Sequence, residues 1–241
     1  MNIESPRRET RERFPSSREI LTDSSTALFL PGAEDWELWE PTAPNRWERT
    51  ANDRQPETCV YCFGVRSVCA IPLWVASAEP AQVRGLIQLQ LEARGMRTNA
   101  GVGEHIDFWV VRREADRTQI LAVVLLEDSA EYGMAEKPSR FDVTPRLYDF
   151  PENAIVLWKE LNQWIVAFTQ GTQLAHFQAL SGAQLDEAAL AELRCISEGL
   201  QFQGFIDQPR RIEVRDPECP SDQARSVGQI LETEAFVQRP A

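Results

Sequence analysis

One stretch of the chain, residues 66–126, constrains the fold more than any other, because strand patterns there flank a capped helix. Residues 65–76 are rich in β-branched and aromatic side chains and predict a strand. Ser77 is then expected as the N-cap of a helix that runs to about Arg94 and ends at Gly95. Apolar residues at helical spacing form its expected core face: Val83, Leu86, Ile87 and Leu91.

Two further strands are expected at 106–112 and 119–127, joined by a charged turn. The second contains the unbroken apolar run ILAVVLL. A strand with one solvated face alternates apolar and polar residues, and this one does not. It is therefore predicted to be a central strand that is covered on both faces.

The charge balance restricts the kinds of partner. The 241 residues include 25 Lys and Arg against 37 Asp and Glu, which gives a net charge of −12. Nucleic acid and anionic lipid surfaces both attract basic proteins, so neither is expected as a partner. No stretch approaches the roughly 18 apolar residues of a membrane span, and the basic start of the chain has no apolar run behind it, so no secretory signal is expected. The odd count of 5 cysteines suits reduced thiols in the cytoplasm.

The beginning of the chain predicts an arm followed by a hairpin. Residues 1–24 are polar and are expected to be a disordered arm. Apolar runs at 26–32 and 36–40 flank Pro31-Gly32 and predict a hairpin whose turn spans Gly32 to Asp35. Residues 41–57 are predicted to be a polar loop, and 59–63 a strand.

After a polar, proline-containing stretch at 129–152, which is interpreted as a linker, the pattern restarts. Three strands are expected in a meander, at 154–160, 163–170 and 174–180. A helix is expected from about Asp186 to Gln203, and its core face comprises Leu185, Ala189, Leu193, Ile196 and Leu200. A final strand at 210–216 and a loose tail at 217–241 complete the prediction, with a short helix over 227–236 as the alternative within the tail.

The two halves share an order, in which strands precede one amphipathic helix and a further strand. A meander followed by a helix and a parallel strand is the repeat of the ribonuclease-H-like fold. The predicted class is therefore α/β, with two ribonuclease-H-like lobes of the actin-type ATPase fold and mixed sheets, at 25–128 and 153–216.

Particular segments strengthen this hypothesis. IPLWVASAEPAQVRGLIQLQLEARG, with Pro72 in its strand, precedes a strand that contains Asp107 and the aliphatic strand at 120–126. This succession resembles the subdomain typical of PilM-type and GspL-type proteins, which are actin-like assembly proteins of type IV pili and type II secretion. The segment ENAIVLWKELNQWIVAFTQGTQLAHFQAL resembles the second lobe of that family, and the resemblance covers roughly 26–216.

The resemblance implies two phosphate-binding hairpin turns, and this chain departs from both. Actin-type ATPases use Asp-x-Gly turns, in which glycine lets backbone amides approach the phosphate. The first hairpin has Gly32 and Asp35 in the wrong order, and the second has Lys159 and Glu160 with no glycine. We therefore interpret these four residues as degenerate phosphate-loop positions, and we expect a pseudo-ATPase without a cofactor.

Other candidate sites receive less support from the sequence. Cys59 and Cys62 form one CxxC pair, but a structural zinc usually needs two such pairs, and no metal site is predicted. His105 and His176 are not at ligand spacing, and no nucleophile motif is present. Most of the seven tryptophans are expected in the core. The two beside polar loops, Trp39 and Trp47, are candidate interface anchors.

The resemblance implies a non-catalytic cytoplasmic scaffold, peripheral to the inner membrane, in a type IV pilus or type II secretion platform. Its expected partners are inner-membrane platform subunits and the assembly ATPase. The alternative is an ATP-binding enzyme of the actin/hexokinase superfamily with remodelled phosphate loops. A third hypothesis is an unrelated two-lobed binding module.

Overall fold

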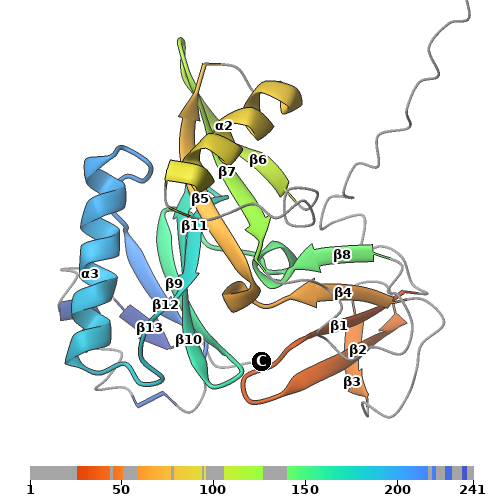
Figure 1. The fold of residues 1–241 in the computed structure, drawn as a ribbon. Coiled ribbons are helices and arrows are strands. Elements are labelled where there is room, and N and C mark those ends of the chain that lie inside the picture. The colour runs from red at the N-terminus through yellow and green to blue at the C-terminus, as the bar shows by residue number, and fades with distance from the viewer. Residues whose placement is uncertain are drawn as a thin grey trace, which may run out of the picture.

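The computed structural model describes residues 26–43, 46–50, 59–76, 79–93, 95, 106–126, 140–216, 219–220, 226–229 and 235–237. These residues form three β-sheets, and helices α2 and α3 lie against two of them (Figure 1). We call them the N-terminal sheet, the inserted sheet and the C-terminal sheet. No helix within the described part of the chain is long and apolar enough to cross a membrane.

The N-terminal sheet has the strand order β3-β2-β1-β4-β8. β1 pairs antiparallel with β2 and parallel with β4, and β8 pairs parallel with β4. The predicted hairpin turn is confirmed, because the Gly32 amide donates to the Asp35 carbonyl at 2.8 Å. The strands are β1 (Ala27–Pro31), β2 (Trp36–Ala43), β3 (Arg46–Thr50), β4 (Cys59–Phe63) and β8 (Arg140–Val143).

The C-terminal sheet repeats this order as β11-β10-β9-β12-β13. Here too the first strand, β9, pairs antiparallel with the second and parallel with the fourth. Helix α3 (Glu187–Phe202) begins where Asp186 accepts the Ala189 amide at 2.9 Å, as a helix N-cap does. The strands are β9 (Ala154–Glu160), β10 (Gln163–Gln170), β11 (Gln173–Ala179), β12 (Arg211–Val214) and β13 (Ala235–Val237).

The inserted sheet lies in the chain between β4 and β8 and has the order β5-β7-β6. Its central strand is the predicted apolar run, and every residue of β7 is buried, which confirms the expectation of cover on both faces. The 3-10 turn η1 (Val65–Ser67) leads into this sheet, and η4 (Thr144–Leu147) follows β8. The remaining elements are β5 (Val68–Val75), α2 (Pro80–Ala93), β6 (Ile106–Arg113) and β7 (Thr118–Leu125).

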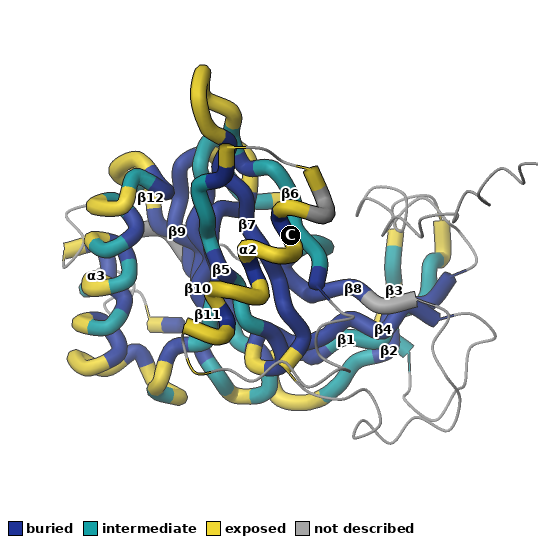
Figure 2. Tube along the Cα trace, turned by 45° about the horizontal axis from the view of Figure 1, so that its top comes forward, coloured by how far each residue is buried: buried dark blue, intermediate teal, exposed yellow. Residues whose placement is uncertain are grey.

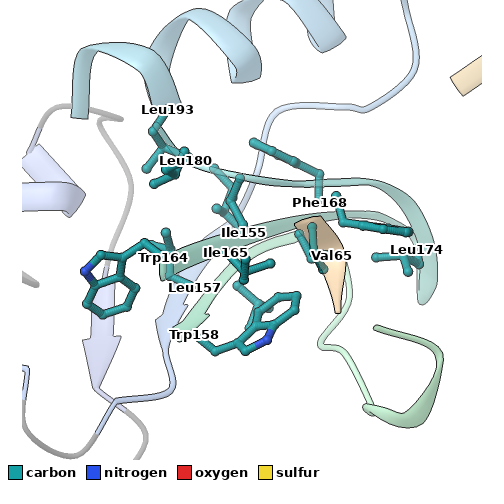
Figure 3. Close-up of a cluster of buried hydrophobic side chains, with 14 of the residues drawn as sticks. Val65, Ile155, Leu157, Trp158, Trp164, Ile165, Phe168, Leu174, Leu180 and Leu193 are labelled. Atoms are coloured by element: carbon teal, nitrogen blue, oxygen red, sulfur yellow. The ribbon is translucent and has the colours of Figure 1, made fainter. Parts of the chain in front are cut away.

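The largest core lies on the C-terminal sheet. Leu193 of α3 is fully buried and lies beside Leu180 over one face, while Trp158 lies on the other (Figure 3). A smaller core forms where Val83, Ile87 and Leu91 of α2 cover one face of the inserted sheet. Both helices are therefore held by the amphipathic pattern that predicted them.

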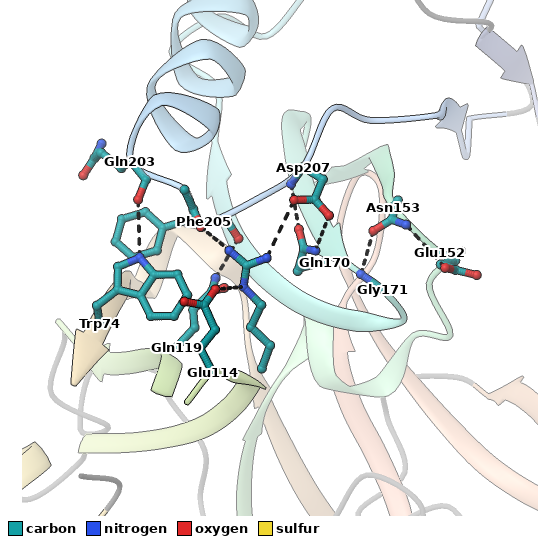
Figure 4. A network of polar contacts seen from close by, with 12 residues as sticks. Trp74, Glu114, Gln119, Glu152, Asn153, Gln170, Gly171, Gln203, Phe205 and Asp207 are labelled. Carbon is teal, nitrogen blue, oxygen red and sulfur yellow. Dashed lines mark hydrogen bonds and ion pairs between the residues drawn. The ribbon is translucent and has the colours of Figure 1, made fainter. Parts of the chain in front are cut away.

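Side chains of the inserted sheet bind backbone carbonyls of the turn that follows α3. Gln119, which is fully buried, donates to the Phe205 carbonyl at 2.7 Å. Arg112 donates to the Gly204 carbonyl at 2.5 Å, and Trp74 donates to the Gln203 carbonyl at 3.3 Å (Figure 4). These bonds tie the inserted sheet to the segment that connects α3 with β12 of the C-terminal sheet.

Three predictions about irregular segments are wrong. The predicted loop at 41–57 contains the end of β2 and all of β3, and the predicted linker at 129–152 contains β8 and η4. The predicted tail at 217–241 contains β13, and its helical residues at 226–229 overlap the start of the alternative helix over 227–236. Each of the three added strands is short and polar or flanked by polar residues, and a neighbouring strand supplies its hydrogen-bond partners.

The predicted helix of the first half covers the inserted sheet and not the N-terminal sheet, so the two halves do not repeat each other helix for helix. Leu86 was expected in its core face but is 42% exposed. It lies about 100° around the helix from Ile87, outside the line of Val83, Ile87 and Leu91. The predictions for Ser77 and for the arm at 1–24 fall outside the described residues.

Candidate functional site

The two hairpin turns that the resemblance marked as phosphate loops bind each other directly. The Leu161 amide donates to the Gly32 carbonyl at 2.8 Å, and the Asn162 amide donates to the Ala33 carbonyl at 2.6 Å. We call this pair of contacts the turn junction. It joins the β1–β2 hairpin of the N-terminal sheet to the β9–β10 hairpin of the C-terminal sheet.

The geometry of the turn junction opposes phosphate binding. A phosphate loop presents free backbone N–H groups to the anion. Here the amides of Leu161 and Asn162 are occupied by carbonyl oxygens, and an anion at this point would meet those oxygens. Both residues also have left-handed backbone angles, with φ of 48° at Leu161 and 63° at Asn162. Such angles are unfavourable for a residue as bulky as leucine, so the turn is held in place by its surroundings.

Glu160 lies behind the turn junction and is only 3% exposed. Its carboxylate accepts the Val65 amide at 2.8 Å, the Thr144 hydroxyl at 2.5 Å and the Trp158 indole N–H at 3.0 Å. Burial raises the pKa of Glu160, while these hydrogen bonds oppose the rise. The side chain joins η1, η4 and β9, so its position is explained by structure and needs no catalytic role.

The other two predicted phosphate-loop residues point elsewhere. The Asp35 carboxylate accepts the amide of its neighbour Trp36 at 2.7 Å. The Lys159 ammonium lies 2.8 Å from Asp216 and 5.0 Å from the Trp164 ring centroid. Of the four positions, therefore, Gly32 takes part in the turn junction and Glu160 supports it, while Asp35 and Lys159 bind local partners.

A groove of about 390 Å³ opens beside the turn junction, between the N-terminal sheet, η4 and β9. Its charged groups have partners: Glu37 binds the Trp39 indole N–H and Arg49, each at 2.9 Å. Lys159 is paired with Asp216, as described above. The groove therefore presents mainly apolar surface, and it brings together the two predicted interface anchors. Its apolar walls include Leu28, Leu30, Trp39, Trp47, Leu147 and Trp158.

The remaining candidates form no site among the described residues. Cys59 and Cys62 are buried, and burial raises the pKa of the Cys59 thiol to about 11 and that of Cys62 well above its ordinary value. No group of three or more potential metal ligands occurs in the described ranges. His176 lies 3.1 Å from the Gln178 side-chain oxygen, whereas His105 is not described.

Asp107 lies apart from the turn junction, on β6. Its carboxylate binds Arg146 at 3.0 Å, and burial raises its pKa although Arg146 opposes the rise. Arg146 also lies 3.4 Å from Asp142, which is buried on β8. The arrangement is an ion-pair cluster that fastens η4 to β6.

Several residues at the site were not identified from the sequence. Thr144, which donates to Glu160, and Tyr148, which lines the groove, fall in the stretch interpreted as a linker, and Val65 contributes through its backbone. The signal for Thr144 was the Thr-Pro pair that starts η4, because proline favours the first position of a helical turn. Nothing in the pattern indicated that Glu160 would be buried.

Strand order and turn junction together define an α/β fold of the actin-like kind, in which the β1–β2 and β9–β10 hairpin turns bind each other. The chain is similar to a chain of the "PilM-PilN type IV pilus biogenesis complex", with 14% identity, 90% of this chain and 88% of that chain covered, and a TM-score of 0.61. The predicted actin-like, PilM-type fold is thus confirmed.

Two further solved structures are similar. A Bacteroides thetaiotaomicron protein with an actin-like ATPase fold and unknown function has 8% identity, coverage of 90% and 93%, and a TM-score of 0.51. The cytoplasmic domain of EpsL, an inner-membrane component of the type II secretion system of Vibrio cholerae, has 12% identity, coverage of 90% and 89%, and a TM-score of 0.49. No protein-family model and no curated protein matches the chain in sequence.

Proposed function

We propose that this chain is a non-catalytic scaffold of a type IV pilus or type II secretion inner-membrane platform. The observation that carries the proposal is the turn junction, in which the amides of Leu161 and Asn162 are bonded to the carbonyls of Gly32 and Ala33. An actin-like protein that uses these amides internally has no cradle for the phosphates of ATP. Its work is then binding, as in a PilM–PilN complex.

In this proposal the N-terminal and C-terminal sheets are the cores of the two actin-like lobes. The predicted lobe at 25–128 is extended by β8, and the predicted lobe at 153–216 is extended by β13. The protein works in the cytoplasm and reaches the inner membrane through its partners. These partners are platform membrane subunits and the assembly ATPase.

The groove beside Trp39 and Trp47 is the proposed contact for a short segment of a membrane subunit. Because Glu37 and Lys159 already have partners, the groove favours an apolar or aromatic side chain over a charged one. Tryptophan in the wall of such a groove supplies large contact area with little loss of side-chain entropy. The segment is therefore expected to insert one or two large apolar residues.

Titration calorimetry with magnesium ATP up to millimolar concentration tests the non-catalytic part. We expect no saturable heat, because phosphate binding would have to break both bonds of the turn junction. Saturable binding with a Kd near micromolar would overturn the proposal and favour the ATP-binding enzyme. ATP hydrolysis measured on the same sample gives an independent reading.

Tryptophan fluorescence with synthetic peptides tests the binding part. The peptides span the cytoplasmic segments of the pilus and secretion platform subunits of the same organism. We expect one of them to shift the emission of the wild type and to bind Trp47→Ala at least tenfold more weakly. Leu89→Ala, an exposed apolar change on α2 away from the groove, is the control and should bind as the wild type does. Equal binding to both variants would remove the groove from the proposal, and no binding by any peptide would contradict the partner class.

A further inference from the structure

Two residues in the wall of the groove beside the turn junction carry hydrogen-bond donors that the described fold does not use, Tyr148 and Arg215. The hydroxyl of Tyr148 has no hydrogen-bond partner among the described residues, and it keeps contact with solvent. Nη1 of Arg215 likewise makes no hydrogen bond with a described residue. A donor in an apolar groove needs an acceptor when water leaves, so a ligand that fills this groove is expected to supply one.

Aromatic packing holds both donors in place. The Tyr148 ring makes edge-to-face contacts with Trp158 and Phe150, with ring centroids 5.5 Å and 6.2 Å apart. The Arg215 guanidinium lies 5.4 Å from the centroid of the same Phe150 ring, and it donates to the Asp149 carbonyl at 2.6 Å. Both side chains therefore flank Phe150 in fixed positions, which lowers the entropy that they lose when a ligand binds.

The charge around Arg215 is positive. Arg211 and Arg215 donate to the two oxygens of a single carboxylate, that of Glu213, at 2.5 Å and 2.6 Å. One negative group thus faces two guanidiniums, and the trio keeps one positive charge. Asp149 binds Arg215 through its backbone carbonyl, and its carboxylate forms no ion pair with any described residue. The surplus charge is therefore not cancelled within the described part of the chain.

The other charges of the groove wall are balanced one to one. Glu37 is paired with Arg49 at 2.9 Å, and Lys159 is paired with Asp216 at 2.8 Å. The positive surplus of the groove therefore lies at Arg215, although the chain as a whole has a net charge of −12. A group of this sign favours a ligand that brings a negative charge to the same point.

The apolar part of the groove has room for the neighbouring side chain of such a ligand. Strands β2 and β3, which carry Trp39 and Trp47, consist mostly of half-buried or exposed residues, whereas β9 is buried almost throughout (Figure 2). A large apolar side chain can therefore lie against the two indole rings while the residue next to it in the ligand reaches Arg215.

We propose that the groove binds an extended peptide segment in which an aspartate or glutamate flanks the inserted apolar residue, and that Arg215 and the Tyr148 hydroxyl hold its carboxylate. The inference rests on the groove of the proposed function and adds the chemistry by which a segment is chosen. Hydrogen bonds to a carboxylate are roughly twice as strong as those between neutral groups. Burial raises the pKa of Tyr148, so its hydroxyl stays protonated and able to donate.

Two small probes test the preference for a carboxylate. They are the acetylated and amidated tripeptides Leu-Trp-Glu and Leu-Trp-Gln, which differ by one charge. Shifts of the indole N–H signals of nitrogen-15-labelled protein give a Kd for each probe. We expect the glutamate probe to bind the wild type at least fivefold more tightly at low salt, and this advantage to shrink at high salt.

The outcomes separate this inference from the proposed function. Equal Kd values for the two probes would overturn the carboxylate contact and leave the groove as a site for apolar residues. Failure of both probes to bind at millimolar concentration would overturn the carboxylate contact together with the groove.

Arg215→Gln and Arg211→Gln form a matched pair of variants. Each removes one positive charge and one of the two donors to Glu213, but Arg211 does not line the groove. We expect Arg215→Gln to abolish the preference for the glutamate probe while it binds the glutamine probe as the wild type does, and Arg211→Gln to keep the preference. The same loss in both variants would indicate a long-range effect of net charge and would contradict the role of Arg215.

Tyr148→Phe tests the second contact in a variant that keeps its packing, because the change removes only a hydroxyl without a described partner. We expect the Kd of the glutamate probe to rise at least threefold, while circular dichroism and Tm stay those of the wild type. An unchanged Kd would show that Tyr148 does not hold the carboxylate.

Discussion

The carboxylate of Glu160 accepts the backbone N–H of Val65 at 2.8 Å, across 95 positions of the chain. Glu160 ends β9 of the C-terminal sheet, and Val65 begins η1, which leads into the inserted sheet, so this bond fixes the one sheet against the start of the other. Because Thr144 and Trp158 donate to the same carboxylate, one side chain holds three segments together.

Removal of this carboxylate should destabilise the protein strongly. Glu160→Ala leaves three buried donors without an acceptor, and an unsatisfied buried donor costs about 1–3 kcal/mol, although such effects are not additive. We expect the free energy of unfolding to fall by about 2–4 kcal/mol in urea denaturation. Glu34→Ala, in the exposed hairpin turn, is the matched control and should change it by less than about 0.5 kcal/mol. A similar effect from both changes would contradict the assigned role of Glu160.

The carboxyl of Asp142 should make stability depend on pH. Burial raises its pKa from 3.8 to about 6, although the Arg146 guanidinium opposes the rise. Between these pH values the folded chain holds a proton that the unfolded chain has released, so stability falls as pH rises through this range. The stabilising contribution is complete below pH 3.8 and is lost above about pH 6.

Asp142→Asn removes this titration. As pH rises from 4 to 7, the free energy of unfolding of the wild type should fall by about 3 kcal/mol relative to that of the variant, as the difference between the two pKa values implies. Urea denaturation at several pH values measures it, with Asp149→Asn on the exposed segment after η4 as the control. A wild-type-to-variant difference that stays constant with pH would show that Asp142 is not responsible.

The left-handed backbone at Leu161 predicts opposite effects for two substitutions. With φ of 48°, Leu161→Gly should raise the free energy of unfolding by about 0.5–1 kcal/mol, since glycine adopts this conformation without strain. Leu161→Val should lower it by more than about 1 kcal/mol, because a β-branched residue is least compatible with positive φ. Thermal and urea unfolding of both variants provide the measurement. Equal effects from glycine and valine would show that side-chain packing, and not backbone strain, governs this position.

Two leucines on helices provide a contrast between core and surface. Leu193 on the inner face of α3 is fully buried, whereas Leu89 on α2 is 61% exposed. Leu193→Ala should lower the free energy of unfolding by about 2–5 kcal/mol because it leaves a cavity. Leu89→Ala should change it by less than about 0.5 kcal/mol. If the two losses are similar in urea denaturation, the assignment of α3 to the main core is wrong.

The sequence predicted the elements whose signals are local. The periodic apolar residues from Ala189 to Leu200 identified α3, and Pro31-Gly32 identified the first hairpin turn. The unbroken apolar run of β7 indicated a strand covered on both faces. In each case the residues that form the element also carry its pattern.

The sequence did not predict elements that depend on distant neighbours. The missed strands β3, β8 and β13 are all edge strands, which pair on one side only and carry few apolar residues. The order of elements also does not state which strands share a sheet, so the expected repeat of strands, helix and strand did not reveal that α2 covers a separate, inserted sheet. The burial of Glu160 depends on donors at Val65 and Thr144, and a Lys-Glu pair at a hairpin usually faces water.

The position of the inserted sheet has a consequence for synthesis. β4 and β8 pair with each other, yet the whole inserted sheet lies between them in the chain. During synthesis, β5, α2, β6 and β7 therefore leave the ribosome before β8 is available to complete the N-terminal sheet. The meander β9-β10-β11, by contrast, pairs segments that leave the ribosome one after another. The sheet that begins first is therefore completed only after the module it carries has emerged.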